Sequence, residues 1–375
     1  MSNINEQLNQ FHDIANSPRK QMDRYLSEGK KIIGWMPVYA PTELVYALGM
    51  IPFGCWGADM QINEAKKYYP AFYCGIAQTV LELGISGAYK GMSAIMIPAL
   101  CDTLKCQGQN WRFAVPDIAM IPVIHPQNRK PQYGKTFMVA KYRKVAEELE
   151  KISGTSLTDE ALAIANEKTN RHNAAMRAFS DLAVDFPNTI NAIARRDVFK
   201  SAFFTEIGSH TEMVEKLNET LNQTAKEQSN KKKVILTGII ADNESLLSIF
   251  DDRNLQIVGD DLANESRQYR TEIPKNKDPM DALAQQFCDR DNCSVLYDAT
   301  KHRVDFLLEM ARAKNADGLI VVMTKFCDPE EFDYVPIKNG FEAAEIPVLQ
   351  IETDRQMAQF EQIKTAVQTF AEMLQ

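Results

Sequence analysis

Two stretches of the chain alternate short apolar runs with helix-compatible segments, and this alternation constrains the fold more than any other feature. In the second stretch the runs are continuous and rich in branched residues, as expected for parallel strands covered by helices on both faces. The runs lie near residues 32–39, 51–56, 93–99 and 118–124 in the first stretch, and 234–240, 255–258, 318–323 and 346–351 in the second. The sequence therefore predicts an α/β fold with two parallel sheets.

The part between the two stretches has a different composition. From about residue 134 to residue 228 glycine becomes scarce, and alanine, glutamate, lysine and leucine recur at helical spacing. Thr158 and Glu160 mark the start of a helix within it. We expect an N-terminal helical segment, a first α/β domain, a mainly helical segment and a second α/β domain, at residues 1–30, 31–133, 134–230 and 231–375.

Charge and hydropathy exclude several classes of function. The chain has 42 basic and 50 acidic residues, a net charge of −8, which argues against nonspecific nucleic-acid binding. No apolar stretch approaches the roughly 20 residues that a membrane helix needs, and the polar first ten residues do not match a secretory signal. We expect a cytoplasmic protein with no membrane partner. It lacks the glycine-rich motifs through which many proteins bind ATP or dinucleotides.

Four of the seven cysteines occupy informative positions. Cys327 follows the apolar run that ends at Met323. Cys101 and Cys106 follow the run that ends near Ala99, and a helix is expected after Cys106. Cys74 is expected just inside a helix that begins near residue 72. Ligands of parallel sheets bind beyond the carboxyl ends of the strands, and a helix N-terminus favours the thiolate that binds metal. These thiols could therefore converge between the two domains.

Each cysteine also has a simpler interpretation as a small buried apolar group. Cys55 is expected in the core, and Cys288 and Cys293 are expected to be structural or to lie in a surface loop. Zinc is the general competitor for clustered thiolates, although the paired short spacings of structural zinc sites are absent. The five histidines are dispersed and pair with no nucleophile.

An ordered set of motifs carries a family resemblance. The set comprises residues 34–44, residues 46–53, Tyr73-Cys74-Gly75, Cys101-Asp-Thr-Leu-Lys-Cys106, Lys325-Phe-Cys-Asp-Pro329 and residues 347–354. It resembles the 2-hydroxyacyl-CoA dehydratase and benzoyl-CoA reductase family over nearly the whole chain, and is most similar to a dehydratase β subunit.

The resemblance implies two Rossmann-like domains with additional helices, and a [4Fe–4S] cluster in each subunit of an αβ heterodimer. Carried over by motif, the cluster ligands would be Cys74, Cys106 and Cys327, with Cys101 as the rival of Cys106. Three protein ligands would leave one iron open to a nonprotein ligand.

The resemblance also implies the reaction, which is the oxygen-sensitive removal of water from an (R)-2-hydroxyacyl-CoA to give a 2-enoyl-CoA. One electron from a separate ATP-dependent iron–sulfur activator would form a ketyl radical, and the electron is then recycled. In a β subunit the cluster would relay or hold that electron, while the α subunit binds most of the substrate, so no acid–base residue is assigned here. The alternatives are the substrate-binding subunit of a related dehydratase or benzoyl-CoA-type reductase, and a noncatalytic α/β interaction subunit with buried cysteines.

Overall fold

Two separate sheets, each of four parallel strands, form the framework of the computed structural model, which describes residues 2–275 and 278–374. The strands are β1 (Ile32–Trp35), β2 (Ile51–Gly54), β3 (Ala94–Pro98) and β4 (Ala119–Val123) in the first sheet, and β5 (Lys232–Gly238), β6 (Leu255–Leu262), β7 (Gly318–Thr324) and β8 (Val348–Thr353) in the second. Each strand overlaps one predicted apolar run. The predicted α/β class with two Rossmann-like parallel sheets is confirmed.

Both sheets have the same strand order, β2-β1-β3-β4 and β6-β5-β7-β8. In the first sheet the chain moves outward from β1 to β2 and then returns to the other side of β1 to form β3. The second sheet reverses in the same way between β5 and β7. Ligands of open parallel sheets bind beyond the carboxyl ends of the strands at such a reversal. The loops that follow β1, β3, β5 and β7 are therefore the first places to search for a site.

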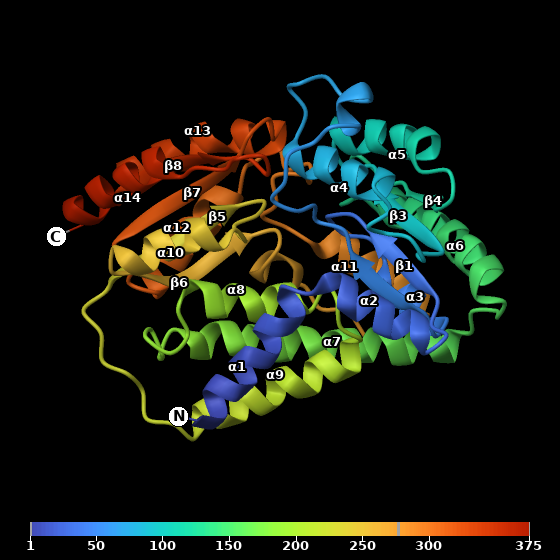
Figure 1. Cartoon of the computed structure of the whole chain (residues 1–375), viewed down its shortest axis with the longest axis horizontal. Coiled ribbons are helices and arrows are strands. Elements are labelled where there is room, and N and C mark those ends of the chain that lie inside the picture. Colours follow the sequence, from blue (N-terminus) through green and yellow to red (C-terminus); the bar gives the residue numbers. More distant parts are fainter. Residues whose placement is uncertain (1, 276–277, 375) are drawn as a thin grey trace.

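Helices flank both sheets (Figure 1). Those that belong to the first stretch of sequence are α3 (Thr42–Ala47), α4 (Gly75–Ile85), α5 (Asp102–Ala114) and α6 (Gln132–Ser153), with the short 3-10 helix η1 (Ala65–Lys67). Those of the second are α10 (Glu244–Asp252), α11 (Pro279–Asp289), α12 (Arg303–Ala313), α13 (Asp328–Ala343) and α14 (Glu361–Met373), with η2 (Ser266–Gln268). No helix within the described residues is both long and apolar enough to cross a bilayer.

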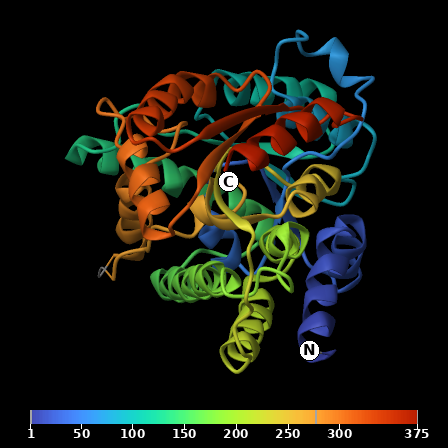
Figure 2. The same cartoon turned by 90° about the vertical axis from the view of Figure 1, so that its left-hand side faces the viewer.

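A helical layer lies along one side of the two sheets in both views (Figures 1 and 2). It contains α1 (Ser2–Ala15), α2 (Pro18–Ser27), α7 (Asp159–Ala183), α8 (Ala192–Ser201) and α9 (Ile207–Asn222). Phe11, Phe179 and Phe199 are at most 1% exposed in its core. The predicted helix start is confirmed, because the Thr158 hydroxyl accepts a hydrogen bond from the N–H of Ala161 at 3.1 Å. Residues 1 and 375, the outer limits of the predicted segments, lie outside the described residues.

Two predicted helix boundaries are wrong, and both concern cysteines. The helix expected to begin near residue 72 begins at Gly75, because Cys74 has an extended backbone with φ −53° and ψ 126°. The helix expected after Cys106 already begins at Asp102, whose carboxylate suits the positive end of the helix. Cys74 and Cys101 are therefore the residues that immediately precede their helices.

Helix α11 belongs in sequence to the second sheet but packs in the core of the first. Phe287 of α11 contacts His125, with ring centroids 4.5 Å apart, and lies in one hydrophobic cluster with the residues of β1 and β3. The buried Arg129 reinforces this contact, because its guanidinium donates to the carbonyl oxygens of Arg290 and Tyr297 at 2.9 and 2.7 Å. The two sheets consequently share a core element.

Arg355, just after β8, joins the two halves of the molecule directly. Its guanidinium donates to both carboxylate oxygens of Asp242, to Asp59 at 3.0 Å and to the carbonyl of Trp56 at 3.1 Å. Gly75 allows this approach, because a Cβ atom there would collide with the carboxylate of Asp354. The glycine in Tyr73-Cys74-Gly75 thus fits the second half of the chain closely against the residue after Cys74.

This ion pair predicts a measurable pH dependence of stability. Burial raises the pKa of Asp242, but the charge and hydrogen bond of Arg355, together with the charges of Lys200 and Arg196, outweigh it and hold the pKa at about 2, below the ordinary 3.8. The pair should contribute about 2 kcal/mol above about pH 5, and about 1 kcal/mol of this should be lost by about pH 3 as the carboxylate becomes protonated. Urea unfolding of the wild type and of an Asp242→Asn/Arg355→Met double variant tests this. If the free energy of unfolding fell by the same amount in the two proteins between about pH 5 and about pH 3, the prediction would be contradicted.

Candidate functional site

A cavity of about 580 Å³ lies where the carboxyl ends of the two sheets face each other. Its walls include Met36 after β1, Leu100 after β3, Ile239 after β5 and Phe326 after β7, together with the start of α4. These are the four strands at which the two sheets reverse direction, so the cavity occupies the place where this architecture binds ligands. It draws residues from both halves of the chain.

Three cysteines line this cavity, and each is the N-cap residue of a helix. Cys74 precedes α4, Cys101 precedes α5 and Cys327 precedes α13. Three helix N-termini, each with a partial positive charge, therefore surround one cavity.

The pKa shifts of the three thiols bear on whether the site requires a bound cation. Burial raises the pKa of Cys101 to about 11. The backbone N–H groups of Leu104 and Thr103 lower this pKa, but burial has the larger effect. Burial also raises the pKa of Cys74, and it raises that of Cys327, where the charges of Cys74 and Cys101 add to the effect. Three thiolates are therefore costly here without a cation between them. A bound metal centre would supply that positive charge, because thiolate is the metal-binding form.

The spacing of the sulfur atoms bears on the kind of metal centre. A single zinc ion binds thiolates at about 2.3 Å in a tetrahedron, which requires the sulfur atoms to lie close together. In the described part of the chain, the only His, Cys, Asp or Glu ligand atoms that form a group of three within 4.8 Å of one another come from His12, Asp197 and Glu244. The three cavity cysteines do not form such a group, so their side chains as they stand do not match a single zinc ion.

The His12 group itself is already occupied by a cation. Arg196 is 1% exposed at its side chain and pairs with Glu244 at 2.6 Å and with Asp197 at 2.9 Å. His12 Nδ1 lies 2.8 Å from Asp197. These contacts explain the cluster as an ion-pair network between α1, α8 and α10.

Cys106 does not lie among the residues that line the cavity. It is on the second turn of α5, and its sulfur lies 3.5 Å from the hydroxyl of Tyr73. The structure thus brings together Cys74 and Cys327 from the predicted ligand set, and it adds Cys101 rather than Cys106. The signal that distinguishes them was available in the sequence, because Asp102 is suited to the first turn of a helix that starts directly after Cys101.

The remaining cysteines and histidines have structural environments. Cys55 is fully buried in the core, as predicted. Cys288 and Cys293 are 4% and 5% exposed, which excludes the surface-loop alternative and leaves the structural one. Burial lowers the pKa of His125 to about 4, and its Nε2 lies 3.3 Å from the carbonyl oxygen of Tyr39.

A buried ionic network, which the sequence did not reveal, supports the Cys327 loop. Glu330, in the first turn of α13, accepts hydrogen bonds from Arg303 at 2.9 Å, from Arg267 at 3.3 Å and from Ser294 at 2.7 Å. Burial would raise the pKa of Asp261 at the end of β6, but Arg267, Arg303 and Arg270 together hold it well below its usual range. The network fixes the start of α13 to the ends of β5 and β6.

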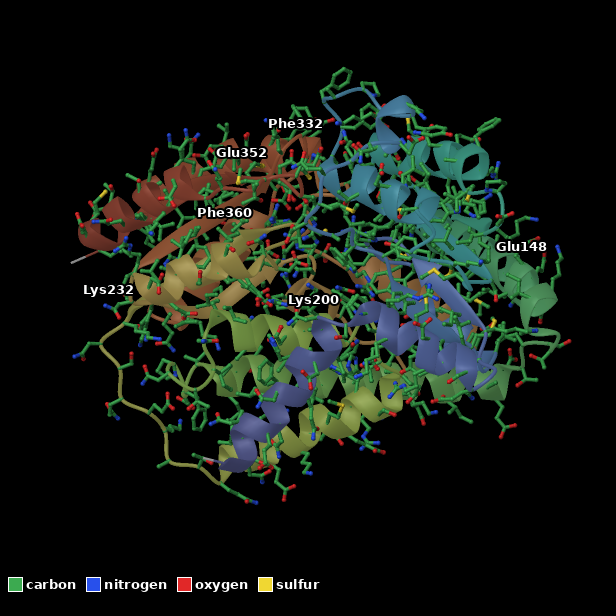
Figure 3. All side chains as sticks on the ribbon, viewed as in Figure 1. Glu148, Lys200, Lys232, Phe332, Glu352 and Phe360 are labelled. Carbon is green, nitrogen blue, oxygen red and sulfur yellow. The ribbon has the colours of Figure 1, made fainter. Side chains whose placement is uncertain are left out.

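Large apolar side chains are exposed at the cavity. Phe332 is 76% exposed on α13, beside the first half of the chain (Figure 3), and Tyr297 is 51% exposed. Phe72 is 66% exposed two residues before Cys74. Exposed apolar residues that gather around a cavity are typical of a surface that another molecule covers.

Comparison with known proteins gives a consistent result. The family model described as "2-hydroxyglutaryl-CoA dehydratase, D-component" matches residues 37–374. The chain is 48% identical over 375 residues to the (R)-phenyllactyl-CoA dehydratase beta subunit of Clostridium sporogenes, with all of both chains covered. It is 39% identical to the lactoyl-CoA dehydratase subunit beta of Anaerotignum propionicum, again over all of both chains. A benzoyl-CoA reductase subunit of Thauera aromatica is 24% identical, in a match that covers 92% of this chain and 91% of the relative.

The match extends from the loop after β1 to the last helix and so includes strands β2 to β8 and all three cavity cysteines. The resemblance that the motifs indicated is confirmed. The chain belongs to the 2-hydroxyglutaryl-CoA dehydratase D-component family.

Proposed function

We propose that this chain is the β subunit of an oxygen-sensitive (R)-2-hydroxyacyl-CoA dehydratase and that it holds one [4Fe–4S] cluster through Cys74, Cys101 and Cys327. The observation that carries the proposal is the convergence of three helix-capping thiols on one cavity at the reversal points of both sheets. The relatives that cover the whole chain are named as dehydratase subunits, which supports the hydro-lyase class.

The residues of this chain would hold the cluster and control its surroundings. The three helix N-termini stabilise a negatively charged centre, and the apolar walls from Met36, Ile239 and Phe326 limit access of water and oxygen. When bound, such a cluster supplies one-electron chemistry at low potential, which suits the relay or storage of the electron for ketyl-radical elimination of water. Three protein ligands leave the fourth position to a nonprotein ligand.

A partner is part of the proposal. The relatives are named as beta subunits, and the exposed Phe332, Tyr297 and Phe72 lie where the cavity could be covered by a homologous α subunit. That α subunit would bind most of the 2-hydroxyacyl-CoA, and a separate ATP-dependent iron–sulfur activator would deliver the electron.

Metal analysis under anaerobic conditions tests the proposal. The full chain, coexpressed with its partner subunit, should contain about four irons and a similar amount of acid-labile sulfide that disappear together in a Cys74→Ala/Cys327→Ala variant. With activator and ATP, the intact complex should convert a 2-hydroxyacyl-CoA to the 2-enoyl-CoA. Zinc in place of iron would overturn the cluster assignment. Iron with net reduction of the thioester substrate would indicate a reductase instead.

A further inference from the structure

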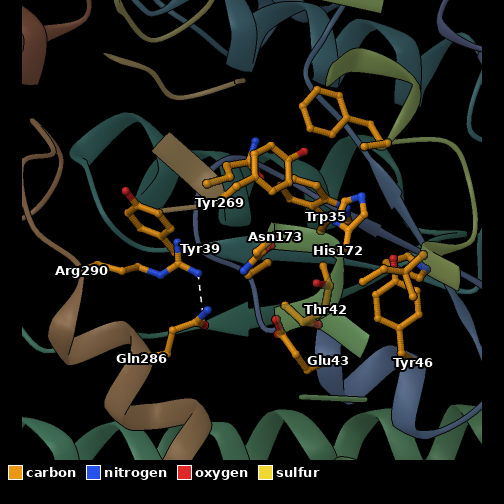
Figure 4. Close-up of a pocket in the computed structure, with 17 residues that line it drawn as sticks. Trp35, Tyr39, Thr42, Glu43, Tyr46, His172, Asn173, Tyr269, Gln286 and Arg290 are labelled. Carbon is orange, nitrogen blue, oxygen red and sulfur yellow. Dashed lines mark hydrogen bonds between the residues drawn. The ribbon is translucent and has the colours of Figure 1, made fainter. Parts of the chain in front are cut away.

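A second, smaller cavity lies on the other side of the segment that follows β1. Met36, Pro37 and Val38 line the cysteine cavity, whereas Tyr39 and Ala40 line this second one, which has a volume of about 90 Å³. Figure 4 shows Arg290 and Gln286 entering from one side and His172 and Tyr46 from the other. The walls include residues of α3, α7, η2 and the end of α11, so distant parts of the sequence build it.

Two buried hydrogen-bond donors in this cavity lack an acceptor among the described residues. Nη1 of Arg290 and Nε2 of Gln268 have no partner, although Nη2 of Arg290 donates to Gln286 at 3.2 Å. The guanidinium is held in place, because its carbon lies 4.3 Å from the centre of the Tyr39 ring. A buried donor without an acceptor is unfavourable, so these groups indicate a ligand that carries acceptor oxygens.

The other walls are suited to a short molecule with a polar end. Glu43 is 5% exposed, and burial raises its pKa, which favours a carboxyl group that can donate as well as accept. Asn173 is 4% exposed, and Trp35 and Tyr269 provide aromatic surface. A volume of about 90 Å³ corresponds to about three water molecules at their liquid volume, which is comparable to a molecule of about four heavy atoms.

An outer hollow adjoins the inner cavity. This hollow of about 400 Å³ shares Tyr46 and Ile207 with the inner cavity. Lys30 and Lys168 line it together with one acid, Glu206. The excess of positive charge at its walls would favour the approach of an anion.

We infer that the inner cavity binds a small monocarboxylate, such as acetate or lactate. Its carboxylate accepts hydrogen bonds from Arg290 and Gln268, and its short tail lies against the aromatic wall near Glu43. A guanidinium and a second N–H donor that line one small cavity suit the two oxygens of a carboxylate. This site is separate from the cysteine cavity, and the inference does not depend on the proposed cluster.

Nuclear magnetic resonance with ¹³C-labelled acetate and lactate tests the inference on the full chain. The ¹³C signals of the labelled acids should broaden in the presence of the protein, and this broadening should saturate as expected for one binding site. Unlabelled lactate should reverse the broadening. Acetamide, which has a similar shape and no charge, should not reverse it. Gln268→Met should weaken binding about tenfold or more, because it removes a hydrogen bond to a charged group. Ala202→Leu should abolish binding by filling the cavity, since Ala202 lines it.

Two controls separate the site from other effects. Arg143→Gln changes an arginine whose side chain is 59% exposed and should leave binding unchanged. Cys101→Ala should also bind normally, so that failure of the cluster proposal and failure of this inference are distinguishable. Absence of saturable binding to the wild type would overturn the inference. Equal binding by the wild type and by the folded Gln268→Met and Ala202→Leu variants would also overturn it.

Discussion

Replacement of Cys101 by alanine is expected to remove nearly all iron from this chain, whereas replacement of Cys106 is expected to leave the iron content unchanged. Cys101 caps α5 and faces the same cavity as Cys74 and Cys327, while the sulfur of Cys106 contacts the Tyr73 hydroxyl at 3.5 Å. A cluster bound by only two protein thiolates loses a covalent anchor that no neighbouring cysteine can replace, because Cys106 lies a full turn further along the helix.

The two variants form a matched pair, since they change the same residue type on the same helix. Anaerobic iron and sulfide analysis of both, beside the wild type, gives the result. Circular dichroism of each variant confirms that it is folded. Iron lost only from Cys106→Ala would restore Cys106 as the ligand, and equal iron in the two variants would contradict the assignment of Cys101 in place of Cys106.

The second large effect is expected from Arg303→Met. The guanidinium of Arg303 is 3% exposed and binds Asp261 at 2.7 Å, Glu330 at 2.9 Å and Asp333 at 3.1 Å. Removing it leaves buried carboxylates without their cation, for which the typical cost is about 3–5 kcal/mol of folding free energy. Because Glu330 holds the first turn of α13, the variant should also bind less iron at Cys327.

Urea unfolding measures the loss of folding free energy, and iron analysis measures the loss of iron binding. Arg143→Met is the control, because its side chain is 59% exposed and its distance to Asp278 is 3.8 Å, so its loss should change stability by less than about 1 kcal/mol. A double variant, Arg303→Met/Glu330→Gln, should recover part of the stability by removing one unpaired charge. A loss from Arg303→Met no larger than that of the control would show that the network does not stabilise the fold.

The strands were predictable because parallel strands buried on both faces need continuous apolar runs, and few other structures produce eight of them at this spacing. Helix starts were harder. The residue types before Gly75 are compatible with a helix, so the sequence alone did not show that the helix begins only at Gly75. The structure shows it, because the backbone of Cys74 is extended. Cys101 and Cys106 both follow β3, and the predicted ligand set contained Cys106 with Cys101 as its rival, although Asp102 directly after Cys101 is suited to a first helical turn.

The buried charges were beyond prediction for a different reason. Arg303 meets Asp261 across 42 positions of the sequence, and Arg267 meets Glu330 across 63. No feature of the neighbouring sequence distinguishes such a buried arginine from one on the surface. The inner cavity is similar, since Arg290, Glu43 and Asn173 come together only when α11 crosses to the first sheet.

The packing of α11 against the first sheet also determines how the protein should unfold. Because Phe287 completes the core beneath the first sheet, the first 230 residues expressed alone would leave an apolar gap there. The remaining residues alone would expose the same apolar helix to water. The two halves therefore depend on each other for folding, and we expect one cooperative unfolding transition in place of two independent ones.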